Sequence, residues 1–296
     1  YIVIKKAIVC HDAGGAELIS NWVLNQKESF YYVIDGPAKE IFRRNLLSEI
    51  KTISLDESLN LCDTFICGTS WNSNLEKKAI KHALDRNKFV IVQLDHWVNY
   101  EDRFIYEGKL NLPNEIWVVD NYAKEMSELL FPNTKIILKN NYYLDKLTKK
   151  AFQYSANKKS HNTALFVAEN IKDHALKVYG DKNKWGYTEF EAISYFLKNF
   201  EKTNLNIKEI IIRPHPSDQP KKYEWALKNK FVTSVFSKNT LIEDIKQASI
   251  IVGCESMALI VGIYTNKKVI SCIPPGGINC RLPHKEILHF EKLLKV

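Results

Sequence analysis

Residues 209–216, EIIIRPHP, place a run of isoleucines directly before an Arg-Pro-His-Pro motif. A continuous apolar run of this length is typical of a strand that is buried on both faces of a parallel sheet. Residues 248–259, ASIIVGCESMAL, repeat the pattern, because an apolar strand runs through Gly253 to Ser256 and then into an apolar helix. This order of strand, polar loop and helix indicates an α/β sheet with a binding site at the carboxyl ends of its strands.

The same alternation of apolar strands and amphipathic helices extends over the rest of the chain. Around residues 147–163 it lapses into a polar, basic segment, which we interpret as a linker between two domains, 1–155 and 156–296. We therefore predict an α/β fold of two Rossmann-like parallel-sheet domains that face a cleft. The expected strands are 2–10, 30–35, 64–68, 89–95, 115–120 and 135–138, then 164–168, 209–213, 231–234, 250–253 and 269–273. The expected helices are 14–25, 37–47, 74–86, 122–130, 188–200, 223–229, 242–248, 256–264 and 284–294.

The composition narrows the class of partner. The 296 residues are 45% hydrophobic and 26% charged, which is ordinary for a globular protein and excludes disorder. The net charge of +8 favours anionic partners such as nucleotides, although scattered lysines are also typical of a biased overall composition. Because no nucleic-acid recognition motif or basic aromatic strand is present, we expect no nucleic-acid partner.

Cysteine usage and hydropathy bear on the compartment. The six cysteines form no CxxC pair and no zinc pattern, which predicts reduced thiols, a cytoplasmic location and no metal. No apolar run approaches the ~20 residues of a membrane span. The final segment, 284–294, alternates apolar residues with lysines. It either packs against the domains or makes a peripheral contact with an anionic inner membrane.

The Arg-Pro-His-Pro loop supplies the first candidate site residues. Two prolines restrict the backbone of the loop, so His215 is held rigidly beside Arg213 at the end of a strand. A histidine in this position can bind a phosphate or protonate a leaving phosphate. The alternative is a histidine in a structural turn.

The second motif indicates an anion site. Ser256 occupies the expected N-cap position of a helix, and the N–H groups at a helix start bind anions. Ser256 also has a structural role open to it, which is to cap its own helix, and the two roles are compatible. We take Gly253, Glu255, Ser256 and Met257 as candidate nucleotide contacts.

The first predicted strand ends in a glycine-rich loop. His11 and Asp12 follow the strand, and Gly14 and Gly15 allow a ligand or backbone to approach the start of the next helix. The spacing is neither GxGxxG nor a P-loop, so a dinucleotide fingerprint is absent. Asp12 is a candidate general base; the alternative is an N-cap aspartate.

Two further strand ends of the first half carry polar and aromatic residues. Asp95, His96 and Trp97 crowd one loop, while Ser70 and Trp71 follow the neighbouring strand. Aromatic rings beside a carboxylate are a common composition of sugar-binding sites, and a packed interdomain loop is the alternative. Asp95 is the second candidate base.

Two loops of the second half complete the candidate set. Glu169 follows the first strand of that half, where a carboxylate can bond to a base or ribose. Pro275 belongs to a Pro-Pro-Gly-Gly turn that either borders the nucleotide pocket or is a plain turn.

Taken in order, these residues resemble the nucleotide-binding domain of GT-B glycosyltransferases. More narrowly, they are similar to bacterial surface-polysaccharide transferases with a His-Pro motif, of the sialyltransferase-like, Kdo-transferase-like and polyglycerolphosphate-transferase-like groups. The resemblance covers roughly residues 164–275 and departs from the sialyltransferase pattern in lacking its acidic motif and a second serine. It rests on Arg213-Pro214-His215-Pro216, Gly253-Cys254-Glu255-Ser256 and Asn266-Lys267-Lys268-Val269-Ile270.

The resemblance implies a specific activity. A sugar, with an acidic sugar of the sialic, Kdo or pseudaminic type first, would pass from a CMP- or CDP-linked donor to a cell-surface glycan or lipid-linked acceptor. His215 and Ser256 would contact the donor phosphate, and Asp12 or Asp95 would deprotonate the acceptor. The chemistry needs no metal or other cofactor, since a histidine, an arginine and a helix dipole can meet the phosphate charge.

Three alternatives stay open. The chain could be a glycerophosphotransferase of the same fold, an epimerase or hydrolase acting on a nucleotide sugar, or an inactive partner that binds a nucleotide sugar.

Overall fold

The chain divides into two compact units, Tyr1–Tyr143 and Leu144–Val296, which we call unit 1 and unit 2. The computed structural model describes residues 4–48, 50–70, 73–153 and 162–295. The expected boundary at residues 155 and 156 lies outside the described residues. Helix α6 (Tyr142–Gln153) runs through the start of the segment that the sequence pattern marked as a linker.

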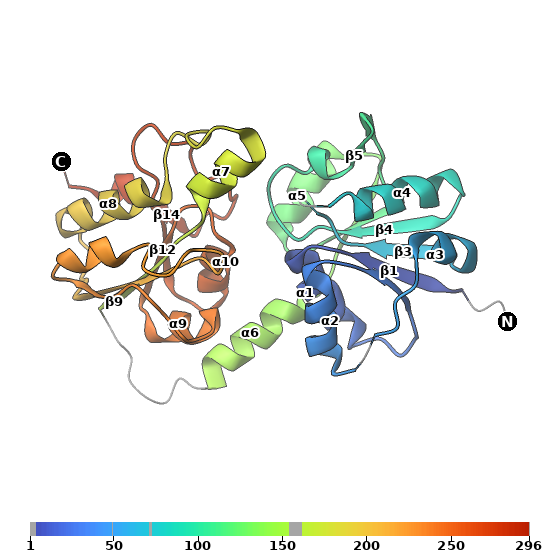
Figure 1. The fold of residues 1–296 in the computed structure, drawn as a ribbon, viewed down its shortest axis with the longest axis horizontal. Helices are drawn as coiled ribbons and strands as arrows, with labels where there is room; N and C mark the ends of the chain where they lie inside the picture. Colours follow the sequence, from blue (N-terminus) through green and yellow to red (C-terminus); the bar gives the residue numbers. More distant parts are fainter. Residues whose placement is uncertain (1–3, 49, 71–72, 154–161, 296) are drawn as a thin grey trace. The chain divides into compact units, whose positions relative to one another are not determined.

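Unit 1 is built on a six-stranded parallel sheet with strand order β2-β1-β3-β4-β7-β8. Its strands are short apolar runs flanked by helices, so both faces of the sheet are covered. Figure 1 shows α1 and α2 on one face and α4 on the other. The strands are β1 (Lys6–Cys10), β2 (Tyr31–Ile34), β3 (Thr64–Cys67), β4 (Phe89–Gln93), β7 (Glu115–Val118) and β8 (Lys135–Leu138). The helices are α1 (Ala13–Val23), α2 (Pro37–Leu46), α3 (Leu55–Leu61), α4 (Leu75–Asp85) and α5 (Asn121–Leu130), and a 3-10 turn (Glu101–Arg103) leads into the hairpin β5 (Ile105–Tyr106) and β6 (Lys109–Leu110).

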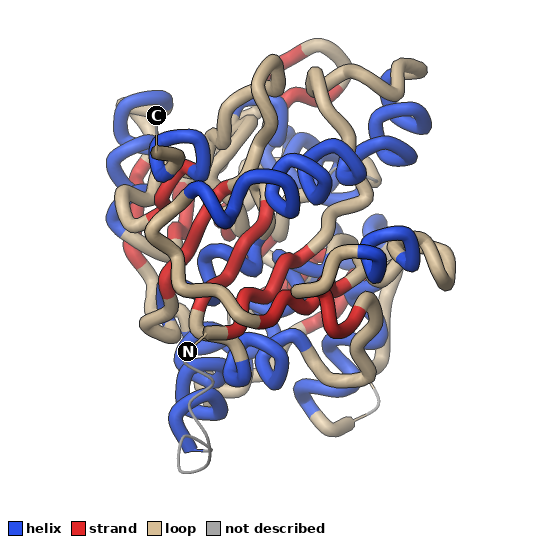
Figure 2. The backbone as a smooth tube through the Cα atoms, turned by 90° about the vertical axis from the view of Figure 1, so that its left-hand side faces the viewer, coloured by secondary structure: helices blue, strands red, loops and turns tan. Residues whose placement is uncertain are grey.

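Unit 2 is also built on a six-stranded parallel sheet, with the strand order β11-β10-β9-β12-β13-β14, so two strands and not one lie on the near side of its first strand, β9. Helix α8 covers one face, and α9 and α10 cover the other (Figure 1). The alternation of strand and helix can be followed along the tube in Figure 2. The strands are β9 (Thr163–Val167), β10 (Glu209–Arg213), β11 (Val232–Ser234), β12 (Ile250–Gly253), β13 (Lys268–Ser271) and β14 (Ile287–His289). The helices are α7 (Ile171–Tyr179), α8 (Glu189–Asn199), α9 (Leu241–Gln247) and α10 (Met257–Tyr264), with 3-10 turns at Phe200–Lys202, Glu224–Lys228 and Phe290–Leu293.

The predicted helix at 284–294 is wrong. Residues 287–289 instead form the edge strand β14, which pairs in parallel with β13, and Phe290 is 1% exposed in the core of unit 2. The backbone donors and acceptors of this segment are therefore used in the sheet, and the surface helix on which the membrane contact rested is not formed. Among the described residues, no helix is long and apolar enough to cross a membrane.

Both sheets have the same topological switch point. The chain leaves the central strand, β1 or β9, toward one edge of the sheet and later returns to pair on the other side of that strand, with β3 or β12. Ligand sites of open α/β sheets lie outside the carboxyl ends of the strands at this point. Functional residues are therefore expected in the loops that follow β1 and β3 in unit 1 and β9 and β12 in unit 2.

Candidate functional site

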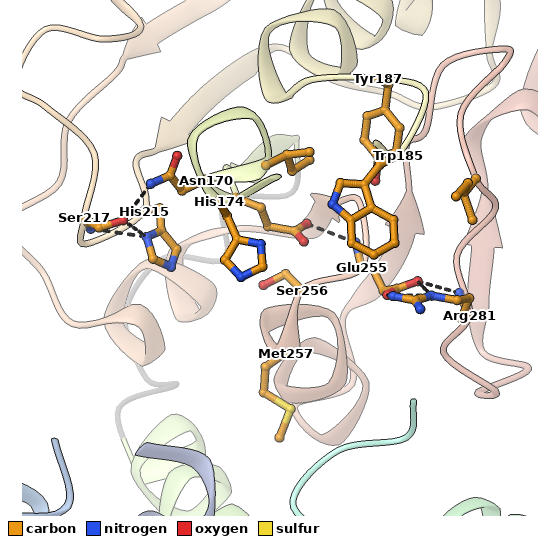
Figure 3. Close-up of a pocket in the computed structure, with 13 residues that line it drawn as sticks. Asn170, His174, Trp185, Tyr187, His215, Ser217, Glu255, Ser256, Met257 and Arg281 are labelled. Carbon is orange, nitrogen blue, oxygen red and sulfur yellow. Dashed lines mark hydrogen bonds and ion pairs between the residues drawn. The ribbon is translucent and has the colours of Figure 1, made fainter. Parts of the chain in front are cut away.

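A cavity of about 500 Å³ opens at the carboxyl ends of β9, β10 and β12 in unit 2, and we call it the unit 2 cavity. Its volume is in the range of small-molecule sites. Figure 3 shows side chains from three strand-end loops and from a fourth loop around Trp185 reaching this volume. The sequence candidates that line it are Glu169, His215, Glu255, Ser256 and Met257. Lining residues that sequence reasoning missed include Asn170, His174, Trp185, Tyr187, Ser217 and Arg281.

The His215 loop is fixed by one buried carboxylate. The backbone N–H of His215 donates to Asp218 Oδ2 at 2.8 Å, and the same carboxylate accepts from the Tyr223 hydroxyl at 2.9 Å and from Lys222 Nζ at 2.7 Å. His215 is partly exposed; its partial desolvation lowers the pKa, Asp218 opposes this, and the positive charges of Lys222 and His174 lower the pKa further. The imidazole is therefore neutral at neutral pH.

Arg213 is not brought to the unit 2 cavity, although the sequence placed it beside His215 as a phosphate contact. Its guanidinium forms an ion pair with the buried carboxylate of Asp244 and donates to the carbonyl of Asn239 at 2.9 Å. Removing either charge of a buried pair leaves the other uncompensated, so the arginine is committed to the packing of the β10 loop against α9.

The loop between β12 and α10 is braced from inside. Glu169 Oε1 accepts hydrogen bonds from the backbone N–H groups of Cys254 at 2.8 Å and Glu255 at 2.9 Å. In this structure the carboxyl therefore holds the loop, whereas the sequence predicted a contact with a base or ribose. Burial raises the pKa of Glu169 to about 7. Ser256 caps α10, because its Oγ accepts the N–H of Ala258 at 3.1 Å. The first N–H groups of a helix have no acceptor within the helix, so the start of α10 is a place where a phosphate would be stabilised.

Aromatic and charged groups form another wall of the unit 2 cavity. Arg281 donates from Nη2 to Glu255 Oε1 at 2.6 Å and from its backbone N–H to Glu255 Oε2 at 2.7 Å. The same guanidinium lies 5.2 Å from the centre of the Trp185 ring. The negative charge of Glu255 is therefore paired with Arg281, and the Trp185 ring lies beside the same guanidinium.

Besides Arg213, two other candidates of unit 2 lie outside this cavity. Pro275 lines a smaller recess. Gly277, in the same turn, packs so closely against the Tyr187 ring that a Cβ would not fit there. Gly253 ends β12, and a Cβ there would make only ordinary contacts with Leu259 and the carbonyl of Val167.

In unit 1, the loop after β1 brings a histidine and two carboxyls together. His11 Nδ1 lies 2.7 Å from Asp12 Oδ1, and the backbone N–H of His11 donates to Glu76 Oε1 at 2.6 Å. Asp12 is the N-cap residue of α1, but its side chain makes no capping bond. Glu76, which sequence reasoning missed, is 1% exposed, and burial raises its pKa to about 7. Nothing in the sequence marks it, since it lies in the first turn of an amphipathic helix.

Asp95 lies over the start of α1, but both neighbours of its carboxylate are strong donors. Oδ1 accepts from Thr69 Oγ1 and from Arg103 Nη1, each at 2.9 Å. Oδ2 contacts the space above Gly14 that a Cβ would fill, which explains the glycine there. Gly15 likewise lies close to the backbone of Gly68.

Trp97 is enclosed within unit 1 and offers no exposed ring face to a sugar. Trp97 is fully buried and donates from Nε1 to Asp120 at 2.9 Å, so the expectation that it binds a sugar is wrong. Ser70 is also buried, and its hydroxyl accepts the N–H of Ser73 at 3.2 Å. His96 is half-buried beside the Trp97 ring. Trp71 lies outside the described residues.

Two α/β units, each built on a six-stranded parallel sheet, define a GT-B-like fold. The chain has 13% identity and a TM-score of 0.54 with the UDP-GlcNAc 2-epimerase of Neisseria meningitidis bound to UDP-GlcNAc, over 86% of this chain and 79% of that one. It has 12% identity and a TM-score of 0.55 with S. aureus MnaA solved with UDP, over 91% and 79%. Anabaena HepE, solved with UDP and glucose, gives 9% and 0.51 over 89% and 80%. No protein family model and no curated protein matches the sequence.

Within the described ranges, no group of three His, Cys, Asp or Glu side chains could hold a metal.

Proposed function

We propose that this protein is a glycosyltransferase that uses a nucleotide-activated sugar as its donor. The observation that carries the proposal is the unit 2 cavity at the switch point of its sheet, where His215, the start of α10 and the Trp185 wall surround one volume. Proteins of similar fold were solved with UDP-GlcNAc, with UDP, and with UDP and glucose, which supports a nucleotide as the occupant.

Each wall of the unit 2 cavity has a chemical role in this proposal. The N–H groups at the start of α10 and the neutral imidazole of His215 donate hydrogen bonds to phosphate oxygens, where negative charge grows as the sugar leaves. Trp185 stacks against the nucleobase, and Arg281 keeps the nearby Glu255 from repelling the phosphates. The phosphate charge is then met without a metal, as the resemblance implies.

For the base that deprotonates an acceptor hydroxyl, we propose Asp12. Its carboxylate is paired with the imidazole of His11 at 2.7 Å, and a hydrogen-bonded histidine both orients a carboxylate and can accept a proton in turn. Asp95 suits the role less well, because its Oδ1 already accepts hydrogen bonds from Thr69 and Arg103.

The donor nucleotide is part of the proposal. The His-Pro resemblance implies CMP with an acidic sugar, whereas the similar structures hold uridine nucleotides. An aromatic face and an arginine recognise either pyrimidine. UDP-GlcNAc and a CMP-linked acidic sugar are therefore the two donors to compare first.

A second candidate function is epimerisation of a nucleotide sugar, because the proteins of similar fold include a UDP-GlcNAc 2-epimerase that was solved with UDP-GlcNAc. Incubation with each donor, with and without a mixture of glycan acceptors, distinguishes the two. A transferase releases nucleotide only with acceptor, and an epimerase changes the sugar without acceptor.

His215→Ala should lose most turnover while keeping its fold. Equal turnover in this variant, or no change of any donor under either condition, would contradict an enzyme of this class.

A further inference from the structure

The hydrogen bonds around His215 fix which of its nitrogens carries the proton. Nδ1 lies 2.7 Å from Ser217 Oγ, and the backbone N–H of Ser217 donates to the same nitrogen at 3.2 Å. A backbone N–H can only donate, so Nδ1 must be the acceptor and carries no proton. In a neutral imidazole, the proton is then on Nε2.

A chain of donors reaches back from His215 and supports the same assignment. Lys222 Nζ can only donate and lies 3.4 Å from Asn170 Oδ1, which orients the carboxamide with its oxygen toward the lysine. The amide nitrogen of Asn170 then donates to Ser217 Oγ at 2.9 Å. Since Ser217 accepts from Asn170, its own hydroxyl hydrogen is available for His215. Figure 3 shows Asn170, Ser217 and His215 in this line, with the second ring nitrogen pointing away from Ser217.

Lys222 itself is held firmly at the start of this chain. Its ammonium lies 2.7 Å from Asp218 Oδ1 and 2.5 Å from Glu189 Oε1, and the Glu189 side chain is 1% exposed. A paired, positioned lysine keeps its three hydrogens, so the direction of the chain from Lys222 to His215 does not reverse near neutral pH.

We propose that Ser217 and Asn170 are positioning residues that hold His215 as the neutral Nε2–H tautomer, so that the imidazole donates a hydrogen bond to a phosphate oxygen in the unit 2 cavity. The hydrogen bond to phosphate rests on the proposed function, whereas the tautomer assignment does not. The lowered pKa of His215 agrees with a neutral ring. Of the two roles open to this histidine, the geometry selects stabilisation of the phosphate over transfer of a proton to it, because a neutral imidazole is a far weaker acid than imidazolium.

The tautomer can be measured without any ligand. A long-range ¹H–¹⁵N NMR spectrum of the ¹⁵N-labelled protein reports the protonation of each imidazole nitrogen, and His215 is identified among the eight histidines by its absence in His215→Gln. We expect a protonated Nε2 and an unprotonated Nδ1 at neutral pH. Ser217→Thr, which keeps the hydroxyl, should preserve this pattern, and Ser217→Ala should shift the population toward Nδ1–H. An Nδ1–H ring in the wild type overturns the tautomer assignment. An unchanged ring in Ser217→Ala overturns the positioning role of the Ser217 and Asn170 side chains, because the backbone N–H of residue 217 then suffices to hold the ring.

The donor role needs a second pair of variants, with UDP as the probe. The side-chain amide of His215→Gln places a donor near the Nε2 position, whereas that of His215→Asn places it near Nδ1. We expect His215→Gln to keep UDP affinity within a few-fold and His215→Asn to lose about tenfold or more. Equal losses in the two variants overturn the donor role. No binding of UDP or CMP to the wild type counts against the proposed function, while the NMR result still decides the tautomer.

Discussion

The buried carboxyl of Glu76 should make the stability of unit 1 fall as the pH rises. Its pKa in the folded chain is about 7, against an ordinary value of 4.5, mainly because of burial. Below pH 4.5 the group is neutral in both the folded and the unfolded chain and imposes no penalty. Between pH 4.5 and 7 the unfolded chain releases the proton first, so the folded state loses stability, and the loss is complete above pH 7. At 1.36 kcal/mol for each pKa unit, the difference from 4.5 to 7 gives about 3 kcal/mol.

Glu76→Gln tests this reasoning because it removes the ionisation and keeps an acceptor for the His11 N–H. We expect urea unfolding to show the wild type losing about 3 kcal/mol more than the variant between about pH 4.5 and pH 8. Glu125→Gln, on the exposed face of α5, is the matched control and should follow the wild type. Glu169 titrates in the same range but is present in all three proteins, so it cancels. Parallel pH profiles for Glu76→Gln and the wild type would refute the reasoning.

Three further substitutions follow from the contacts of the site and its supports. Trp185→Ala should weaken nucleotide binding by roughly 5- to 150-fold, since stacking on a base contributes about 1–3 kcal/mol. Calorimetric titration with UDP and CMP measures the affinity, and an unchanged affinity would mean that the base does not stack on Trp185. Asp244→Asn should destabilise the protein by about 3 kcal/mol in urea unfolding because it leaves Arg213 partly buried and unpaired, and a change below about 1 kcal/mol would mean that solvent already neutralises the arginine. Gly14→Ala should lower stability by about 1–3 kcal/mol by displacing Asp95, and a neutral result would show that this carboxylate moves freely.

Strand positions could be predicted well from the sequence, because buried parallel strands are continuous apolar runs with few other interpretations. Residues 209–213 and 250–253 form strands at the predicted bounds. The segment 284–294 failed because its apolar residues also fit helical spacing, and only the unpaired edge of β13 decides that it extends the sheet. The segment 223–229 forms a 3-10 turn over Glu224–Lys228 where a helix was expected.

Residues at strand ends could also be predicted, because parallel topology sends them to one edge of the sheet. His215, Ser256 and Glu169 do line one cavity. The partners of these residues could not be predicted, since ion pairs such as Arg213 with Asp244 and Glu255 with Arg281 join positions far apart in sequence.

Aromatic residues show the same limit of sequence reasoning. Trp97 and Trp185 look alike as isolated tryptophans beside polar residues, yet Trp97 is fully buried and Trp185 lines the unit 2 cavity. Burial depends on what packs around each ring in the folded unit, and the local sequence does not carry that information.

The most direct measurement of the central claim is nucleotide binding to the unit 2 cavity. Thermal unfolding would be followed for the wild type, Trp185→Ala and the control Glu125→Gln with UDP, CDP, CMP and GDP. A pyrimidine nucleotide at 100 times its dissociation constant should stabilise the wild type and the control by about 2.7 kcal/mol, and Trp185→Ala clearly less at the same concentration. Stabilisation by no nucleotide, or equal stabilisation of all three proteins, would contradict the assignment of this cavity as the donor site.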